Sequence, residues 1–306
     1  MIREFFKYII YKFEVYLSRF IGPHNYFLLS RKWVVYCKSK KSALIGNLCY
    51  GNNFAVKRAM GKNFTSNCMI EHGVYFGRYV IEEECMIPEI STIYTYSPYR
   101  LEVLNEHFMG TLGKDIVPVG PYIRYARHFY SECKLNRMKR ENGRTLLIFP
   151  THSSPEINQS FDYNAWLNEI RLRAEGFDTV IISLYWLDFR NGSYKYYENK
   201  GYTLMCNGNR FDPFFLNRQK DLIYLADMTM SNDIGTHIGY CICENKPHYI
   251  YQQKIKYESI DDGKVHEDMN SRIRHQEYQE IFDAFSEFSG KITTIQTELV
   301  RYYWGI

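Results

Sequence analysis

The sequence lacks the features that mark several large classes of protein. It has no apolar run long enough to span a bilayer, no internal repeat and no low-complexity tract. Its 8 cysteines are scattered and do not form the two C-x-x-C pairs of a typical zinc site. A net charge of +4 is too small to predict a nucleic-acid-binding surface. These absences argue against a membrane-spanning protein, a zinc module, a repeat protein and a nucleic-acid-binding protein.

The first residues also lack the pattern of a secretory signal peptide. Arg3, Glu4, Lys7 and Lys12 interrupt the apolar residues, and no small-residue cleavage site follows. Scattered cysteines in a chain of this length are typical of reduced, mostly buried thiols and not of a disulfide framework. We therefore expect a cytoplasmic protein, which would lie on the inner face of the cytoplasmic membrane if its N-terminal segment binds lipid.

The composition itself supports a folded core. The chain has 306 residues, of which 45% are hydrophobic and 24% charged, enough for two domains of ordinary size or one large domain. Aromatic residues reach 17%, mostly Tyr and Phe. This content suits surfaces that stack on carbohydrate, and it is equally typical of a genome biased toward Tyr, Lys, Ile and Asn.

Residues 1–30 combine an apolar stripe with basic residues. The stripe recurs at helical spacing and consists of Ile2, Phe5, Phe6, Ile9, Phe13, Tyr16, Leu17 and Phe20. Arg3, Lys7, Lys12 and Arg19 lie off this stripe. The pattern predicts an amphipathic helix that either packs on its own domain or lies on an anionic membrane surface. The helix can do both if its own domain covers only part of the apolar stripe.

Residues 31–126 show the irregular alternation of a small α/β domain. Apolar runs predict short strands at 33–37, 68–72, 92–96 and 115–120. A helix is predicted at 99–109. The basic, polar stretch 127–144 follows, and we interpret it as a linker with a surface helix at a domain boundary.

Residues 145–273 alternate more regularly between strand and helix patterns. Strands are predicted at 145–149, 179–186, 203–206, 228–230 and 248–251. Helices are predicted at 161–174 with Asp162 as its cap, at 215–226 and from 234. This order predicts a parallel sheet with helices on both faces. We expect a charged loop at 258–268 and C-terminal helices within 274–306, broken near Gly290.

Polar residues follow two of these strands at the sheet edge where parallel α/β proteins bind ligands. The run after 145–149 contains Thr151, His152, Ser153 and Ser154. The run after 228–230 contains Ser231, Asn232, Gly235, Thr236 and His237. Hydroxyls, histidines and the N–H groups of a helix start together suit a phosphate ester. Ordinary caps and turns are the alternative interpretation of either loop taken alone.

Two adjacent residues in the first half are candidates for acid–base chemistry. Glu71 and His72 follow the apolar residues 68–70 at the end of the predicted strand 68–72. A histidine or carboxylate poised near neutrality can remove a proton from a hydroxyl group. The alternative is a histidine that is hydrogen-bonded within a tight turn at Gly73.

The order of these segments resembles a glycosyltransferase of the GT-B type. ADMTMSNDIGTHIGYCICENKPHYI, residues 226–250, is similar to the donor-phosphate segment of that class. Five shorter motifs look like uncharacterised transferases encoded with bacterial capsule, lipopolysaccharide or O-antigen genes: LLIFPTHSS, VIISLYW, NGNRFDPFFLNR, EHG and RYYWG. The resemblance covers roughly residues 65–305. It implies two Rossmann-like domains facing a cleft, with the C-terminal helix packing back on the first domain.

The resemblance also implies roles for the candidate residues. His72, assisted by Glu71, would be the base on the acceptor hydroxyl. Thr151, His152, Ser153, Ser154, Ser231, Asn232, Gly235, Thr236 and His237 would hold the phosphate of a nucleotide-sugar donor. Arg210 and Asp212 would line the nucleotide pocket. The acceptor would be a lipid-linked or growing surface glycan at the inner membrane surface.

Two departures narrow the expected donor. Many GT-B enzymes have a Glu early in the phosphate helix that holds the ribose, whereas this chain has Ile238, Gly239 and Tyr240 there. The EHG and THSS motifs favour the cytidine-using members, and a CMP-sugar first among their donors. No Asp-x-Asp motif of the metal-dependent GT-A class is present, so we expect neither a metal nor another cofactor.

Two alternatives remain open from the sequence. One is a CDP-dependent transferase of glycerophosphate or another alditol phosphate, which would form a phosphodiester. The other is a non-catalytic nucleotide-binding scaffold, which would bind a nucleotide without any transfer.

Overall fold

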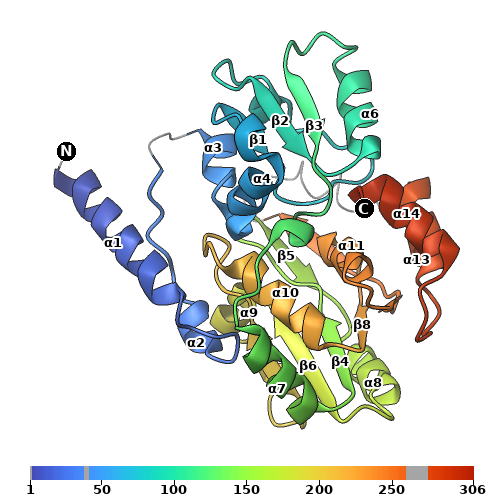
Figure 1. The fold of residues 1–306 in the computed structure, drawn as a ribbon. Helices are drawn as coiled ribbons and strands as arrows, with labels where there is room; N and C mark the ends of the chain where they lie inside the picture. The colour runs from blue at the N-terminus through green and yellow to red at the C-terminus, as the bar shows by residue number, and fades with distance from the viewer. Residues whose placement is uncertain (1, 38–40, 260–274) are drawn as a thin grey trace.

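The computed structural model describes residues 2–37, 41–259 and 275–306. Two parallel sheets with helices around them make an α/β protein, as the sequence predicts (Figure 1). The first sheet contains β1 (Cys68–Ile70), β2 (Thr92–Thr95) and β3 (Asp115–Pro118), in that order. These strands fall within three predicted apolar runs.

The predicted strand at 33–37 is wrong. This segment pairs with no strand among the described residues and runs beside α1 (Ile2–Ser18). The Val34 N–H donates to the Glu14 carboxylate at 2.9 Å, and the Tyr36 ring meets Tyr8 with centroids 5.1 Å apart. The apolar residues therefore pack against a helix instead of entering a sheet.

Short helices surround the first sheet. One further short helix, α2 (Tyr26–Leu29), packs on the second half of the molecule, where Tyr26 stacks on Phe189. The helices around the first sheet are α3 (Ser42–Gly46), α4 (Asn52–Met60), α5 (Glu82–Cys85) and α6 (Pro98–His107). The last of these is the helix predicted at 99–109, and the Ser97 hydroxyl caps it by accepting from the Arg100 N–H. The segment 127–144 contains α7 (Glu132–Asn142), the predicted surface helix.

The second sheet has the strand order of a doubly wound fold. Its five strands run β7-β6-β4-β8-β9, and every neighbouring pair is parallel. They are β4 (Thr145–Phe149), β6 (Thr179–Leu184), β7 (Thr203–Cys206), β8 (Met228–Ser231) and β9 (His248–Ile250). The chain reverses its direction of winding between β4 and β8, which is where open parallel sheets bind ligands.

Helices cover both faces of this sheet because its buried strands alternate their side chains. On β4, Leu147 and Phe149 face α10 (Phe215–Leu225) and α11 (Thr236–Cys243). Leu146 and Ile148 face α8 (Tyr163–Arg173) and α9 (Trp186–Asn191) on the other side. The Asp162 carboxylate caps α8 by accepting from two backbone N–H groups, as expected.

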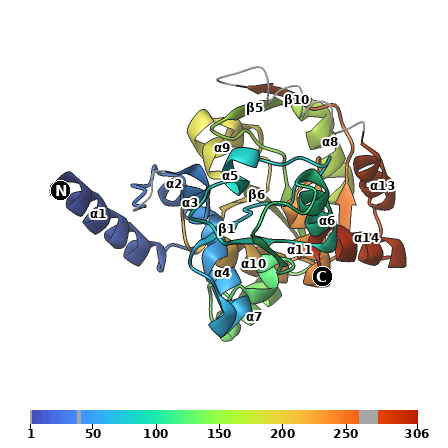
Figure 2. The same cartoon turned by 90° about the horizontal axis from the view of Figure 1, so that it is seen from above.

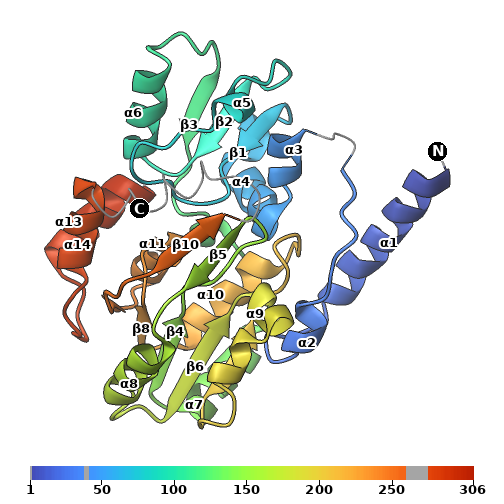
Figure 3. The ribbon, with the colours of Figure 1, turned by 180° about the vertical axis from the view of Figure 1, so that it is seen from behind.

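A two-stranded antiparallel ribbon was not predicted. It joins β5 (Ile157–Ser160) to β10 (Lys256–Ser259). The ribbon lies along the region between the two sheets (Figure 3). The predicted charged loop 258–268 thus begins inside β10, and its remainder, 260–268, lies outside the described residues.

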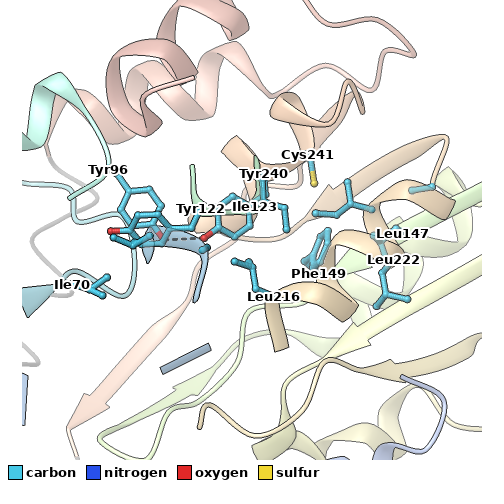
Figure 4. Close-up of a cluster of buried hydrophobic side chains, with 14 of the residues drawn as sticks. Ile70, Tyr96, Tyr122, Ile123, Leu147, Phe149, Leu216, Leu222, Tyr240 and Cys241 are labelled. Carbon is cyan, nitrogen blue, oxygen red and sulfur yellow. Dashed lines mark hydrogen bonds between the residues drawn. The ribbon is translucent and has the colours of Figure 1, made fainter. Parts of the chain in front are cut away.

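One hydrophobic core joins the two sheets. It includes Ile70 and Tyr96 from the first half and Leu147, Phe149 and Leu216 from the second (Figure 4). The hydroxyls of Tyr96 and Tyr240 hydrogen-bond at 2.9 Å inside this core. Burial of these aromatic and aliphatic groups contributes most of the free energy that holds the two halves together.

The C-terminal helices pack back on the first half, as the resemblance implied. They are α13 (Gln276–Ala284) and α14 (Thr294–Trp304), and the break between them contains Gly290. The Trp304 ring lies 5.2 Å from Phe76, and the Tyr302 hydroxyl donates to Glu102 at 2.7 Å. Figure 2 shows α14 beside both α6 and α11.

Candidate functional site

A cavity of about 330 Å³ lies between the two sheets. Its floor is formed by residues that follow β4 and β8, and by α11. Residues from the first half face this floor: Tyr50, Asn52, His72 and Gly73. The cavity is therefore at the carboxyl edge of the second sheet, at its change of winding direction.

The N-terminus of α11 opens into the cavity. Gly235 is the N-cap residue, and Thr236 and His237 form the first turn. A Cβ at position 235 would lie 2.9 Å from the His237 ring, so this position has no room for a side chain unless that ring shifts. The first N–H groups of a helix have no partner within it and carry partial positive charge. This end of α11 can therefore receive an anionic group.

Thr236 also links the two halves. Its hydroxyl accepts from the Val74 N–H at 3.1 Å, and its carbonyl accepts from the Trp304 indole at 3.2 Å. The hydroxyl keeps its own hydrogen for donation, because it acts only as an acceptor toward Val74. Its position in the cavity wall lets that hydrogen reach a ligand.

Two histidines in the wall are held by aromatic stacking. His152 stacks on Tyr185 with centroids 4.0 Å apart, and His237 stacks on Phe149 at 4.9 Å. Burial lowers the pKa of His152, and it lowers the pKa of His237 to about 3. Both rings are thus neutral at pH 7. His237 Nε2 is buried and has no protein partner among the described residues.

His72 enters the cavity from the loop after β1. Burial lowers its pKa, so the ring is neutral at pH 7 and can accept a proton. Both ring nitrogens lie 3.5 Å from the Tyr75 hydroxyl. Its carbonyl accepts from the Asn52 side chain at 3.2 Å, whereas the Asn52 amide oxygen is buried without a protein partner in the described chain.

Glu71 does not share the cavity with His72. Its carboxylate accepts from Arg100 Nε at 2.8 Å and from Arg100 Nη2 at 2.7 Å, and the Thr95 hydroxyl donates to it. Both charged side chains are almost fully buried. The structure therefore gives Glu71 a buried ion pair behind His72, in place of the expected contact with an acceptor.

Four of the predicted phosphate ligands lie outside the cavity wall. The Ser153 hydroxyl accepts from the Gln159 N–H at 2.9 Å, and the Ser154 hydroxyl accepts from two N–H groups of the turn before β5. Ser231 bonds His248 Nε2 at 3.0 Å, and the Asn232 carbonyl oxygen accepts from the Thr151 N–H at 2.6 Å. The accepting atom of Asn232 is its side-chain Oδ1, so all four side chains shape the loops. Thr151, His152, Gly235, Thr236 and His237 line the cavity instead.

Arg210 and Asp212 also lie outside the wall. Arg210 pairs with Glu156 at 2.8 Å. Asp212 forms a fully buried ion pair with Arg218 at 2.9 Å and accepts from the Ser18 hydroxyl at 2.6 Å. The expectation that Asp212 lines a nucleotide pocket is corrected by this geometry, since its carboxylate anchors the end of α1.

The wall contains polar residues that the sequence analysis did not select. Ser183 is the second-last residue of β6, and Asn207 directly follows β7. The Asn207 side-chain amide donates to Ser183 at 3.3 Å, while its Oδ1 atom is buried and unpartnered among the described residues. The hydroxyls of Tyr50 and Tyr185 meet at 3.2 Å. The sequence did carry a signal for Ser183 and Asn207. Each is a single polar residue within or directly after an apolar strand, at the edge of the sheet where ligands bind.

The charge of the wall is unusual for a nucleotide site. Asp233 is its acidic residue, and the described wall includes no Lys or Arg. No cluster of three or more His, Cys, Asp or Glu side chains able to hold a metal ion occurs in the described part of the chain.

Comparisons with protein-family models, curated proteins and solved structures give no match to this chain.

Proposed function

We propose that the protein is a glycosyltransferase of GT-B architecture that uses a nucleotide-sugar donor. The observation that carries the proposal is the cavity itself, in which the N-terminus of α11 faces His72 from the other half. A phosphate site and a proton acceptor in one cavity are what transfer from a sugar phosphate to a hydroxyl requires. The two sheets would then be the donor-side and acceptor-side domains.

In this reaction the acceptor hydroxyl oxygen attacks the anomeric carbon of the donor sugar. The bond from that carbon to the phosphate oxygen breaks, and its electron pair leaves with the nucleotide. His72 takes the hydroxyl proton. The N–H groups at the start of α11 and the Thr236 hydroxyl stabilise the charge that develops on the leaving phosphate. The acceptor would be a lipid-linked or growing bacterial surface glycan.

The charge of the wall supports a CMP-sugar over a sugar bound to a nucleoside diphosphate. A second phosphate group adds negative charge, and the wall that the described residues form has neutral histidines and Asp233 but no Lys or Arg to balance it. One helix N-terminus contributes roughly half a positive charge. A leaving group with a single phosphate therefore fits this site better.

A thermal-shift screen with CMP, CDP, UDP, GDP, ADP and TDP tests the donor site. A nucleotide that binds only the folded chain raises the melting temperature by mass action. We expect the largest shift with CMP. A larger shift with CDP would favour the alditol-phosphate transferase, and no shift with any nucleotide would reject the donor site.

The base is tested by His72→Ala. We expect transfer to fall at least a hundredfold, while the nucleotide-induced shift in melting temperature persists. His107→Ala is the matched control, because His107 pairs with Glu82 away from the cavity. Turnover at the wild-type rate in His72→Ala would remove this residue from the mechanism. Binding without transfer in the wild type would indicate the scaffold.

A further inference from the structure

The N-terminal helix α1 presents a continuous apolar face to solvent. Its exposed large side chains include Phe5 at 61%, Phe6 at 59%, Phe13 at 59%, and Phe20, just beyond its end, at 71%. Ile9, Ile10 and Tyr16 are exposed beside them. At 3.6 residues per turn, these positions fall within about 140° of the helix circumference. Exposed aromatic groups in such a row are rare on a soluble surface.

The C-terminal end of α1 is docked on the protein, and the side opposite its apolar face contacts the segment 33–37. The Ser18 hydroxyl donates to Asp212, and Arg218 donates to Ser18 at 2.7 Å. The Glu14 carboxylate holds the Val34 N–H at 2.9 Å. These contacts fix the rotation of the helix about its own axis. Because of these contacts the apolar face points away from the protein. Most of α1 stands clear of the body in all three ribbon views (Figures 1 to 3).

Basic residues border this apolar face on both sides. At helical spacing, Arg3 lies along one edge, and Lys12 and Arg19 lie along the other. All three side chains are exposed. Glu4 falls on the far side of the helix and pairs with Lys7 at 3.0 Å, whereas Glu14 lies just beyond Arg3 and accepts from the Val34 N–H. An apolar strip edged by cations complements a surface that is apolar inside and anionic at its rim.

We propose that α1 lies in the interface of an anionic lipid bilayer and holds the protein on the membrane surface. The aromatic and aliphatic side chains enter the boundary between headgroups and acyl chains, and Arg3, Lys12 and Arg19 contact the headgroups. No helix of the described residues is long and apolar enough to cross a membrane. The proposal does not depend on the proposed transfer chemistry, since lipid binding is measured without donor or acceptor.

The next helix, α2, carries two further exposed apolar side chains. Phe27 is 60% exposed and Leu28 is 54% exposed on this short helix, which follows α1 directly. Arg218 also donates to the Ile21 carbonyl at 2.8 Å, which fixes the chain between the two helices. The two helices would therefore meet the bilayer as one rigid unit.

Sedimentation of the full chain with lipid vesicles tests the proposal. We expect binding to vesicles of phosphatidylcholine with about a third phosphatidylglycerol, and binding at least tenfold weaker to phosphatidylcholine alone. Raising the salt concentration should weaken the first without abolishing it, because burial of the apolar face is not screened. Equal, negligible binding to both vesicle types would overturn the proposal.

Paired variants separate the apolar face from general stickiness. Phe6→Ser with Phe13→Ser should lower vesicle binding at least tenfold, since each phenyl ring loses its burial in lipid. The matched control is Leu172→Ser with Ile295→Ser, at positions that are 59% and 62% exposed on α8 and α14. These helices lie on the other side of the molecule (Figure 1). The control should bind like the wild type, and equal losses in both pairs would overturn the proposal.

Sedimentation velocity without lipid distinguishes the competing occupant, a second copy of the chain. We expect a monomer at the concentrations used for vesicle binding, with an unchanged melting temperature in both paired variants. A wild-type dimer that becomes a monomer on Phe6→Ser with Phe13→Ser, together with no vesicle binding, would assign the apolar face to self-association.

Discussion

At the scale of single residues, His237 makes stability depend on pH. Its folded pKa of about 3 lies below the ordinary value near 6.5 that it regains on unfolding. Below pH 6.5 the His237 ring binds a proton in the unfolded chain but stays neutral in the folded chain. The unfolding free energy therefore falls as the pH falls. The slope is about 1.4 kcal/mol per pH unit, or about 2 kcal/mol between pH 6.5 and pH 5.

The substitution His237→Asn should remove this part of the pH dependence. We expect the variant to lose about 2 kcal/mol less unfolding free energy than the wild type between pH 7 and pH 5, as measured by urea unfolding. The difference between variant and wild type should stay constant between pH 7.5 and pH 8.5, where neither state carries the proton. If the unfolding free energies of variant and wild type changed in parallel down to pH 5, the His237 ring would be protonated in the folded chain.

The Thr236 hydroxyl is the clearest single contact to the proposed phosphate. Thr236→Val keeps the shape of the side chain and removes its donor, which should raise the dissociation constant of the nucleotide about tenfold. Thr236→Ser is the matched control, because it retains both the hydroxyl and the contact with Val74. Calorimetric titration with the best nucleotide of the thermal screen measures both. Equal affinity in wild type and Thr236→Val would exclude this hydroxyl from the site.

The sequence predicts which residues are near this site better than it predicts what they do. His152, Thr236 and His237 lie in the cavity wall because residues that follow parallel strands of one sheet gather at its carboxyl edge. His72 joins them from the loop after β1 of the first sheet. Glu71 precedes His72, yet on an extended chain neighbouring side chains point to opposite sides. Its carboxylate therefore meets Arg100, a partner 29 positions away that no local pattern reveals.

At the scale of the elements, Gly239 sets the packing of α11 against α14. A Cβ added at this position would lie 2.2 Å from the Trp304 ring. Alanine normally stabilises a helix over glycine by about 1 kcal/mol. Here Gly239→Ala should destabilise the protein by about 1–3 kcal/mol, because the ring must move within a filled core. Urea unfolding measures the change.

A double-mutant cycle isolates this contact from other effects. In a Trp304→Ala background the ring is gone and only the Cβ of residue 304 stays close, at 2.7 Å, so the destabilisation by Gly239→Ala should become smaller. The same destabilisation in both backgrounds would place the strain elsewhere. The cycle also tests how far the C-terminal helix holds the two halves together, because Trp304 packs on Phe76 of the first half.

Buried strands are predictable from this sequence and the exposed ribbon is not. The strands of the second sheet read as apolar runs because helices cover both faces. The ribbon strands Ile157–Ser160 and Lys256–Ser259 are short and largely polar, and their partners are separated by about a hundred residues. The segment 33–37 shows the opposite error: its apolar residues are strand-like, but it has no neighbouring strand and packs on α1.

At the scale of the whole molecule, the shared core decides how the protein unfolds. Side chains of the first half, such as Val56 and Tyr96, pack in one cluster with Leu147 and Leu222 of the second. The Tyr96–Tyr240 and Val74–Thr236 hydrogen bonds cross between the halves. Neither half can therefore open without exposing apolar surface of the other.

Unfolding should consequently be a single cooperative transition. Val56→Ala in the first half should lower the unfolding free energy by about 1–2 kcal/mol, and Leu222→Ala in the second half by about 2–5 kcal/mol. Each substitution should shift the midpoint of the same single transition to a lower urea concentration. Far-ultraviolet dichroism and tryptophan fluorescence should give coincident urea curves for both variants, since no half melts alone. Two separated transitions, each shifted by only one of the substitutions, would mean that the halves are independent domains and that the cavity between them can open freely. A cooperative transition would instead make the distance between His72 and the start of α11 a fixed property of the folded chain, as a preorganised transfer site requires.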